Sequence, residues 1–191
     1  MIKREELSLD KQKILDNIGL IALDLDRTTL TSRGLTEPTK LCLEEAIRRG
    51  YQVVIATGRP YVALPESIHG IAGLKYVICS NGAHIIDLRS GEFIFSDYLS
   101  IEASKWVEDF LLRSGYPIEV FSEGGAYIGR DRYEYFQTDG KDVDGAAYVV
   151  RTRKPVDDIW KFWEDHVDTI ENINVHFTDP ADKRALNREL S

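Results

Sequence analysis

Three short apolar runs, each about the length of one strand, constrain the fold of this chain more than any other feature. The runs are GLIALDL at 19–25, QVVIA at 52–56 and YVIC at 76–79. Continuous apolar runs of this length are typical of strands that are buried on both faces of a parallel sheet. After the first run, Thr36 can cap a helix that has Pro38 in its first turn and Gly50 just past its end. Strands and helices in this order predict a parallel sheet with right-handed crossovers.

The pattern changes beyond residue 84, where two apolar runs on either side of 89–91 predict a hairpin. Further elements expected there are a helix at 101–113, strands at 118–121 and 126–129, a helix at 156–167, a strand at 173–177 and a last helix begun by Asp179 and Pro180. Antiparallel strands interleaved with helices indicate a separate α+β domain. We therefore predict an α/β chain with a parallel-sheet domain over residues 1–84 and an α+β domain over 85–191. Residues 1–18 are expected to form a short helix or a loose arm.

The charge balance excludes several classes of partner. With 32 acidic and 24 basic residues, a nucleic-acid or anionic-membrane binder would have to concentrate its Lys and Arg in one patch, and the sequence has no such patch. No apolar run approaches the roughly 20 residues of a membrane helix, and the N-terminus lacks the apolar core of a signal peptide. Cys42 and Cys79 cannot form a disulfide framework. We expect a cytoplasmic protein with no nucleic-acid and no membrane partner.

Small polar or acidic residues follow all three predicted strands. They are Asp24 and Asp26 after the first strand, Thr57 and Gly58 after the second, and Asn81 after the third. In parallel sheets, ligands bind at the carboxyl ends of the strands. Asp and Thr also end strands for purely structural reasons, so one such motif alone would not indicate a site, whereas three in succession do. With Pro60 opening a helix, Thr57 and Gly58 are expected to form a cradle for an anion.

The motifs LDLDRTTL, VVIATGRP and ICSNGA, one at each strand end, resemble those of the haloacid dehalogenase-like superfamily, and within it those of the Cof-type phosphatases. The resemblance is close over residues 19–88 and loose beyond them, and the first two motifs at this spacing are strongly specific. It implies a Rossmann-like parallel-sheet core, here partial, followed by most of an α+β cap domain. It also implies hydrolysis of a small phosphorylated metabolite.

The resemblance further implies a role for each matching residue. Asp24 is the expected nucleophile, which attacks phosphorus and forms an aspartyl-phosphate, and Asp26 is the expected general acid and base. Thr57 and Gly58 are expected to bind the phosphoryl group, and Asn81 to face the substrate site. A magnesium ion (Mg2+) is expected to be held by the Asp24 carboxylate and the Asp26 backbone carbonyl, because this ion prefers oxygen ligands.

Other residues of the motifs and their surroundings have less definite roles. Arg59 is expected to bind substrate unless it forms a salt bridge within the core domain, and Thr28 is expected to brace the turn after the first strand. Position 27 is usually Gly in the family and is Arg here; its side chain is expected in solvent, with contact to the substrate as the alternative. The four histidines have no metal-ligand spacing and are expected at surfaces or interfaces. Cys79 is expected to be buried in its strand.

The family completes its site after the cap with a Lys and an acidic GDxxND-like strand end, and neither is present before Ser191. The candidates in the tail, Asp179, Asp182 and Lys183, fit better as the cap and charged surface of a helix. In the family topology, strands after the cap flank the first strand, so the run at 19–25 is expected to form an exposed apolar edge. We expect the chain to form a homo-oligomer through this edge, to rearrange locally over it, or to be an incomplete gene product.

The sequence thus predicts a magnesium-dependent phosphatase that acts on a small organic phosphate such as a sugar phosphate. Two alternatives stay open. A phosphosugar mutase shares the nucleophile and a related cap, but it returns the phosphoryl group to a sugar instead of water. A catalytically impaired remnant would bind a phosphate-like ligand or a partner chain without turnover, and the missing Lys and third acid favour that alternative.

Overall fold

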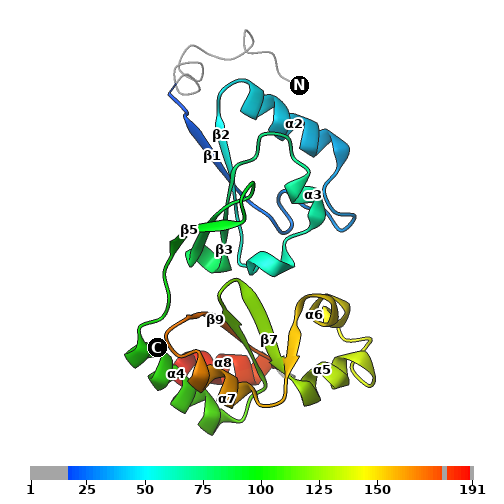
Figure 1. Cartoon of the computed structure of the whole chain (residues 1–191). Coiled ribbons are helices and arrows are strands. Elements are labelled where there is room, and N and C mark those ends of the chain that lie inside the picture. Colours follow the sequence, from blue (N-terminus) through cyan, green and yellow to red (C-terminus); the bar gives the residue numbers. More distant parts are fainter. Residues whose placement is uncertain (1–16, 178–179, 190–191) are drawn as a thin grey trace. The chain divides into compact units, whose positions relative to one another are not determined.

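The computed structural model describes residues 17–177 and 180–189, so the expectations for residues 1–16 and for Asp179 lie outside the described part (Figure 1). The strands form two sheets, one with five strands in the order β1-β2-β3-β4-β5 and one with four in the order β8-β7-β6-β9. The strands of the first sheet are β1 (Leu20–Asp24), β2 (Gln52–Ala56), β3 (Tyr76–Cys79), β4 (His84–Asp87) and β5 (Glu92–Ser96). The hairpin strands β4 and β5 therefore continue the sheet that β1 begins.

Strands β1, β2 and β3 run parallel, in a register that brings their carboxyl ends to one edge of the sheet. Asp24 lies opposite Ala56, and Ala56 lies opposite Ile78. The predicted α/β fold with a parallel sheet is confirmed by this pairing. The residues that follow these three positions in the chain are the ones that carry the sequence motifs.

Helix α2 (Glu37–Arg48) forms the crossover from β1 to β2 and has the predicted ends. It begins where the Thr36 side chain accepts a hydrogen bond from the Thr39 amide. Just past its end, Gly50 has a φ of 94°, a backbone conformation that costs little only for Gly. Local sequence signals alone were sufficient to place this helix.

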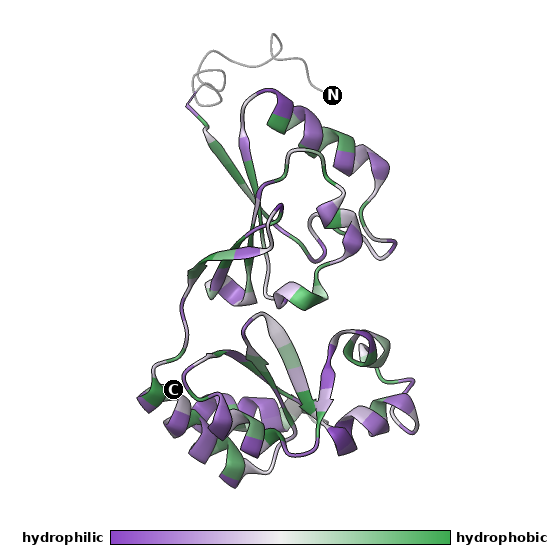
Figure 2. Ribbon diagram, viewed as in Figure 1, coloured by the Kyte–Doolittle hydropathy of each residue, from purple (hydrophilic) through white to green (hydrophobic). Residues whose placement is uncertain are grey.

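Strand β1 is much more exposed than β2. Val53, Val54 and Ile55 of β2 are all buried, whereas Leu20 of β1 is 57% exposed and Asp24 at its end is exposed too. The expectation that the first run is buried on both faces is wrong, because β1 has only β2 beside it in the described part of the chain. The expected apolar edge is confirmed, and Figure 2 shows how hydrophobic this edge strand is.

The second crossover is shorter than predicted. Pro60 precedes η2 (Tyr61–Ala63), a single 3-10 turn, and Pro65 precedes α3 (Glu66–His69). Leu64 lies between them with extended backbone, since a following Pro disfavours the helical conformation. A turn of this length offers no helix N-terminus for an anion, so that part of the predicted cradle is wrong.

The second sheet combines antiparallel and parallel pairing. Strand β6 (Ile118–Ser122) pairs antiparallel with β7 (Gly125–Gly129) and with β9 (Ile170–Val175), and β7 pairs parallel with β8 (Lys154–Val156). The helices of this region are α4 (Ile101–Ser114), α5 (Arg130–Gln137), α6 (Ala146–Thr152), α7 (Ile159–Asp165) and α8 (Pro180–Glu189). Strands β6 and β7 and helix α4 were predicted. Helices α5 and α6 were not, because the segment around them is polar and interrupted by Gly and Asp.

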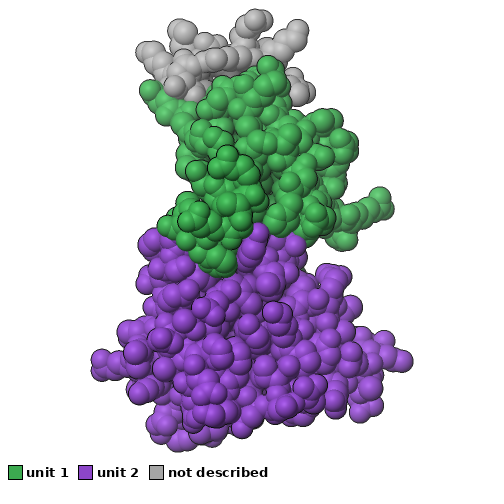
Figure 3. All heavy atoms as spheres, viewed as in Figure 1, with its two compact units in different colours: residues 1–57, 65–78, 85–94 green, residues 58–64, 79–84, 95–191 purple. Residues whose placement is uncertain are grey.

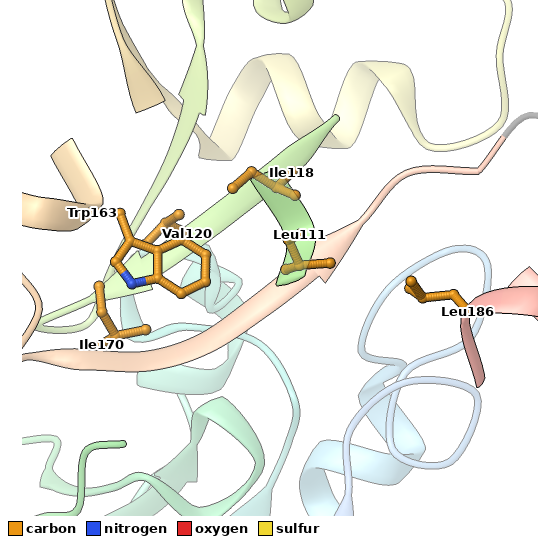
Figure 4. Close-up of a cluster of buried hydrophobic side chains, with 6 residues drawn as sticks. All are labelled: Leu111, Ile118, Val120, Trp163, Ile170 and Leu186. Atoms are coloured by element: carbon orange, nitrogen blue, oxygen red, sulfur yellow. The ribbon is translucent and has the colours of Figure 1, made fainter. Parts of the chain in front are cut away.

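A cluster of buried side chains links this sheet to its helices (Figure 4). Its members are Leu111, Ile118, Val120, Trp163, Ile170 and Leu186. Trp163 is fully buried, and its indole N–H donates to the Ser104 hydroxyl at 2.8 Å. Helix α7 is therefore anchored in the core of this region by Trp163.

The chain divides into two compact units, coloured separately in Figure 3. The first unit contains the described residues up to Thr57, Pro65–Ile78 and Ile85–Ile94, and the second contains Gly58–Leu64, Cys79–His84 and the residues from Phe95 onward. Because two loops of the parallel-sheet region belong to the second unit, the predicted domain boundary between residues 84 and 85 stays a prediction. Within the described residues, no helix is long and apolar enough to cross a bilayer.

Candidate functional site

The turn after β1 presents two carboxylates to solvent. Asp24 ends the strand and Asp26 follows the buried Leu25, and both aspartates are exposed. The turn is held by Thr29, whose hydroxyl donates to the Asp24 carbonyl at 2.6 Å and whose own side chain is buried. Thr28 is exposed. The residue that braces the turn is therefore Thr29, and the expectation for Thr28 is wrong.

Arg27 lies at the tip of this turn with a φ of 62°, in the left-handed region. This conformation costs a residue with a Cβ about 1 kcal/mol relative to Gly, which explains why the family pattern has Gly here. The Arg27 side chain is exposed, as expected. Its backbone adopts the turn that the motif needs, at a cost in stability.

Thr57 directly follows β2, the strand that pairs with β1. It follows Ala56, the partner of Asp24 in the register, and its amide donates to the Ile78 carbonyl at 2.9 Å. Neighbouring strands are about 4.8 Å apart, so the structure places Asp24 and Thr57 next to each other at the carboxyl edge of the sheet. The Thr57 residue is buried, in contrast to the exposed Asp24.

Gly58 and Asn81 meet within the second unit. A Cβ on Gly58 would lie 2.7 Å from the Asn81 Oδ1, so the Asn81 side chain would have to move if another residue stood here. Asn81 has a φ of 58° and Ser80 a φ of 50°, and the Ser80 amide donates to the Arg59 carbonyl at 2.9 Å. The loops after β2 and β3 thus hold each other, and a side chain at position 58 would displace the Asn81 amide.

Arg59 is half-buried and is oriented by two contacts. Its Nη1 donates to the Ala63 carbonyl at 3.1 Å, and its guanidinium lies 5.0 Å from the centre of the Tyr148 ring. Tyr148 also lines a hollow of about 400 Å³ in the second unit, together with Glu119 and Arg153. No sequence signal pointed to Tyr148, because it lies in helix α6, which was not predicted.

The oxygen donors of the first motif suit a magnesium ion. Within residues 17–177 and 180–189, no group of three or more His, Cys, Asp or Glu side chains could hold a metal. Magnesium needs fewer protein ligands, since it usually keeps several waters and binds one or two carboxylates. The exposed Asp24 and Asp26 supply hard oxygen donors of that kind, so the residues present fit this ion.

The sequence and the fold of this chain have matches among known proteins. Residues 21–191 match the family model of haloacid dehalogenase-like hydrolases, and the chain therefore belongs to this family. Among solved structures, a haloacid dehalogenase-like hydrolase from B. subtilis has a TM-score of 0.69 and 25% identity, covering 90% of this chain and 66% of that one. The resemblance inferred from the three motifs is confirmed.

Two relatives illustrate the range of similarity in sequence. A protein from Buchnera aphidicola subsp. Schizaphis graminum (strain Sg) is 27% identical over 189 residues, which is 90% of this chain and 68% of that protein. The pyridoxal phosphate phosphatase of Escherichia coli (strain K12) is 34% identical over 83 residues, or 43% of this chain and 30% of the enzyme. The chain thus spans at most about two thirds of the length of these proteins.

Proposed function

We propose that this chain carries the nucleophile and phosphoryl-binding residues of a magnesium-dependent phosphatase that acts on a small phosphorylated metabolite. The observation that carries the proposal is the placement of Asp24 and Thr57 on neighbouring parallel strands, at the carboxyl edge of the sheet. Exposure of Asp24 and Asp26 supports it, because a reacting carboxylate must be reachable by the substrate.

In the first step, a carboxylate oxygen of Asp24 attacks phosphorus and forms an aspartyl-phosphate. The bond between phosphorus and the ester oxygen breaks, and Asp26 gives its proton to that leaving oxygen. Thr57 and the Gly58 amide hold the phosphoryl oxygens by hydrogen bonds, and Asn81 and Arg59 contact the substrate. In the second step, Asp26 takes a proton from a water whose oxygen attacks phosphorus. The bond to Asp24 breaks, and inorganic phosphate leaves.

The Asp24 carboxylate and the Asp26 carbonyl would hold the magnesium ion. When bound, the ion supplies positive charge that offsets repulsion between the carboxylates and the phosphate. Each such pair of like charges 4 Å apart costs about 4 kcal/mol at an effective dielectric of 20. The phosphoryl group is then positioned near Asp24 by Thr57, Gly58 and Asn81.

A small organic phosphate such as a sugar phosphate is the proposed substrate class. The similarity to an enzyme that acts on pyridoxal phosphate supports a small phosphorylated metabolite. Transfer of the phosphoryl group to a second sugar, as in a mutase, and binding without turnover are the alternatives that a product analysis separates. We also propose a cytoplasmic location, on the basis of the cysteine content of the sequence.

The test is phosphate release by the 191-residue chain, with magnesium, from a panel of sugar phosphates and pyridoxal phosphate. The wild-type chain is expected to release phosphate from at least one of them, and Asp24→Asn is expected to abolish this release. Asp139→Asn, at an exposed aspartate of the second unit, is the matched control and should retain activity. An inactive wild-type chain, or an Asp24→Asn variant as active as wild type, contradicts the proposal.

The apolar edge of β1 is proposed as the surface through which the chain forms a homo-oligomer. Unpaired strand edges offer free N–H and C=O groups to another strand, and Leu20 adds exposed apolar area. Light scattering should show self-association of wild type and a weaker association of Leu20→Lys. A wild-type chain that is monomeric at all concentrations rules out a homo-oligomer.

A further inference from the structure

His84 and Glu171 form an ion pair in which both side chains are completely buried. The His84 Nε2 and Glu171 Oε2 atoms are 2.6 Å apart, and both side chains have an exposed fraction of 0%. The two residues belong to the second unit, although they begin β4 and lie in β9 respectively. The expectation that all four histidines lie at surfaces or interfaces is therefore wrong for His84.

The remaining polar atoms of the pair are engaged as well. The His84 Nδ1 is 3.0 Å from the Ser96 hydroxyl, and its ring meets the Tyr98 ring edge-on at 5.5 Å. The Glu171 Oε1 accepts a hydrogen bond from the Gly124 amide at 2.8 Å. Removing an acid and a base from water can cost more than their contact returns, so a buried pair of this kind is weak grounds for stability alone. A positional role is the better explanation.

The pair connects the two loops that carry the predicted phosphoryl-binding and substrate-binding residues. On one side, His84 is the second residue after η3 (Ser80–Gly82), the turn that contains Asn81. On the other side, Gly124 is the second residue of the β6–β7 turn, and its carbonyl accepts the Val62 amide at 3.1 Å. Val62 lies in η2, close in sequence to Gly58 and Arg59. Glu171 therefore contacts both His84, next to the loop of Asn81, and Gly124, which is hydrogen-bonded to the loop of Gly58 and Arg59.

The β6–β7 turn is itself rigid. Glu123 and Gly124 both have positive φ angles, 49° and 73°, the combination that defines a tight two-residue hairpin turn. Ser122 and Gly125 close this turn as a strand pair. A tight turn that is closed by a strand pair offers a defined anchor for the two loops.

We propose that Glu171 is a positioning residue of the phosphatase site. Through His84 it fixes the loop of Asn81, and through Gly124 and Val62 it fixes the loop of Gly58 and Arg59. This inference rests on the proposed function for its catalytic consequence. Preorganised donors act on a phosphoryl group only when held within a fraction of an ångström of their working position, so loosening the pair weakens phosphate binding.

The experiment compares wild type with Glu171→Gln, which keeps an acceptor for the Gly124 amide but removes the charge that pairs with His84. Amide hydrogen exchange of Ser80 and Val62 is measured by NMR, together with the Kd for inorganic phosphate in the presence of magnesium. We expect faster exchange at Ser80 and a Kd raised about tenfold, the equivalent of one hydrogen bond to a charged group. In the active enzyme, KM should rise by a similar factor while kcat changes much less.

The matched control is Glu119→Gln, which removes another buried carboxylate of the same unit. Glu119 pairs with Arg153 and His176, outside both loops. It should lower stability without changing Ser80 exchange or the phosphate Kd. If Glu171→Gln does not fold, His84→Gln removes the same pair from its other side.

Unchanged Ser80 exchange and phosphate Kd in the folded Glu171→Gln or His84→Gln variant overturn the positioning role. Equal effects of Glu119→Gln overturn it too, because they would reflect general loosening. An inactive wild type contradicts the proposed function alone, since the exchange and phosphate measurements require no turnover.

Discussion

The carboxylates of the β1 turn and those of the second sheet differ in their exposure and in the groups that they contact. Asp24 and Asp26 are exposed and lie in a turn that is held by backbone contacts and by Thr29. Glu119 and Glu171 are buried, and each is paired with a basic side chain inside the second unit. The comparison indicates that exposed acids at the strand ends are available for chemistry, whereas buried acids hold the fold and its loops.

Among the buried carboxylates, Glu119 has a pKa that its surroundings shift. Burial alone would raise the pKa of Glu119, but the hydrogen bond from His176 and the adjacent Arg153 outweigh it and hold this pKa below its usual value of 4.5. A carboxyl group with a lowered pKa in the folded state stabilises the fold above its unfolded pKa, and this contribution is lost as the pH falls through the folded value. Substitutions in the two regions should thus separate effects on activity from effects on stability.

The largest effect is expected from Trp163→Ala. Removing this fully buried side chain leaves a cavity in the core of the second unit and should lower its free energy of unfolding by about 4 kcal/mol. Urea unfolding followed by circular dichroism measures the change. Trp106→Ala, at a tryptophan that is 56% exposed, is the control and should cost about 0.5 kcal/mol. Equal losses of unfolding free energy in the two variants would contradict the assignment of Trp163 to the core.

Glu119→Ala should come next, with a loss of about 3 kcal/mol, because Arg153 is left as an uncompensated buried charge. By contrast, Asp24→Asn should change the unfolding free energy by no more than about 0.5 kcal/mol, as expected for an exposed side chain. The same urea titration serves for both. A larger loss in Asp24→Asn than in Glu119→Ala would reverse the comparison.

The contribution of Glu119 to the pH dependence of the unfolding free energy tests the same comparison. Between pH 7 and pH 3, the wild-type chain should lose more stability than Glu119→Gln, because only the wild type has at position 119 a carboxyl group whose pKa is lowered by folding. Unfolding free energies measured at several pH values give the two slopes. Parallel slopes would mean that the Glu119 pKa is not lowered in the folded state.

Much of this organisation could be predicted from the sequence, and the reason differs between regions. Helix α2 was predicted with its ends because Thr36 and Gly50 are strong local signals. The strand ends at Asp24 and Thr57 were predicted because apolar runs and crossover length determine where parallel strands stop. Helices α5 and α6 were missed, since their stability comes from packing on Ile128 and Phe136 more than from a local pattern.

The residues around the predicted site were harder to foresee. The choice of Thr29 over Thr28 depends on which hydroxyl turns toward the Asp24 carbonyl, and adjacent threonines give no sequence signal for that. The His84–Glu171 pair joins residues far apart in the chain, so no spacing rule can find it. The pair depends on the packing of β9 beside the loop after β3.

Arg27→Gly should stabilise the first unit by about 1 kcal/mol, because Gly adopts the positive φ at this position without strain. Arg33→Gly, at an exposed Arg outside the left-handed region, is the control and should be neutral or slightly destabilising. Thermal unfolding at low protein concentration measures both. A loss of stability in Arg27→Gly would show that the arginine side chain makes a contact that outweighs the strain.

The smallest effect concerns the two thiols. Burial, with a contribution from the charge of Glu171, raises the pKa of Cys79 to about 12, so this thiol stays protonated and unreactive at neutral pH. Cys42 is exposed. A thiol reagent should label one cysteine in the native chain, none in Cys42→Ser, and both after unfolding. Rapid labelling of Cys79 in the native chain would contradict its burial beside Glu171.

The most direct test of the account asks whether Asp24 becomes phosphorylated. Asp26→Asn keeps the nucleophile but lacks the base for the second step. With a phosphate ester that has a good leaving group, such as p-nitrophenyl phosphate, the phosphoryl group should therefore be transferred to Asp24 and stay there. Acid quenching with magnesium present, followed by peptide mass spectrometry, locates the phosphoryl group. We predict that it lies on Asp24 and is absent from the Asp24→Asn variant. A chain that turns over substrate without phosphorylating Asp24, or that carries the group on another residue, contradicts the account.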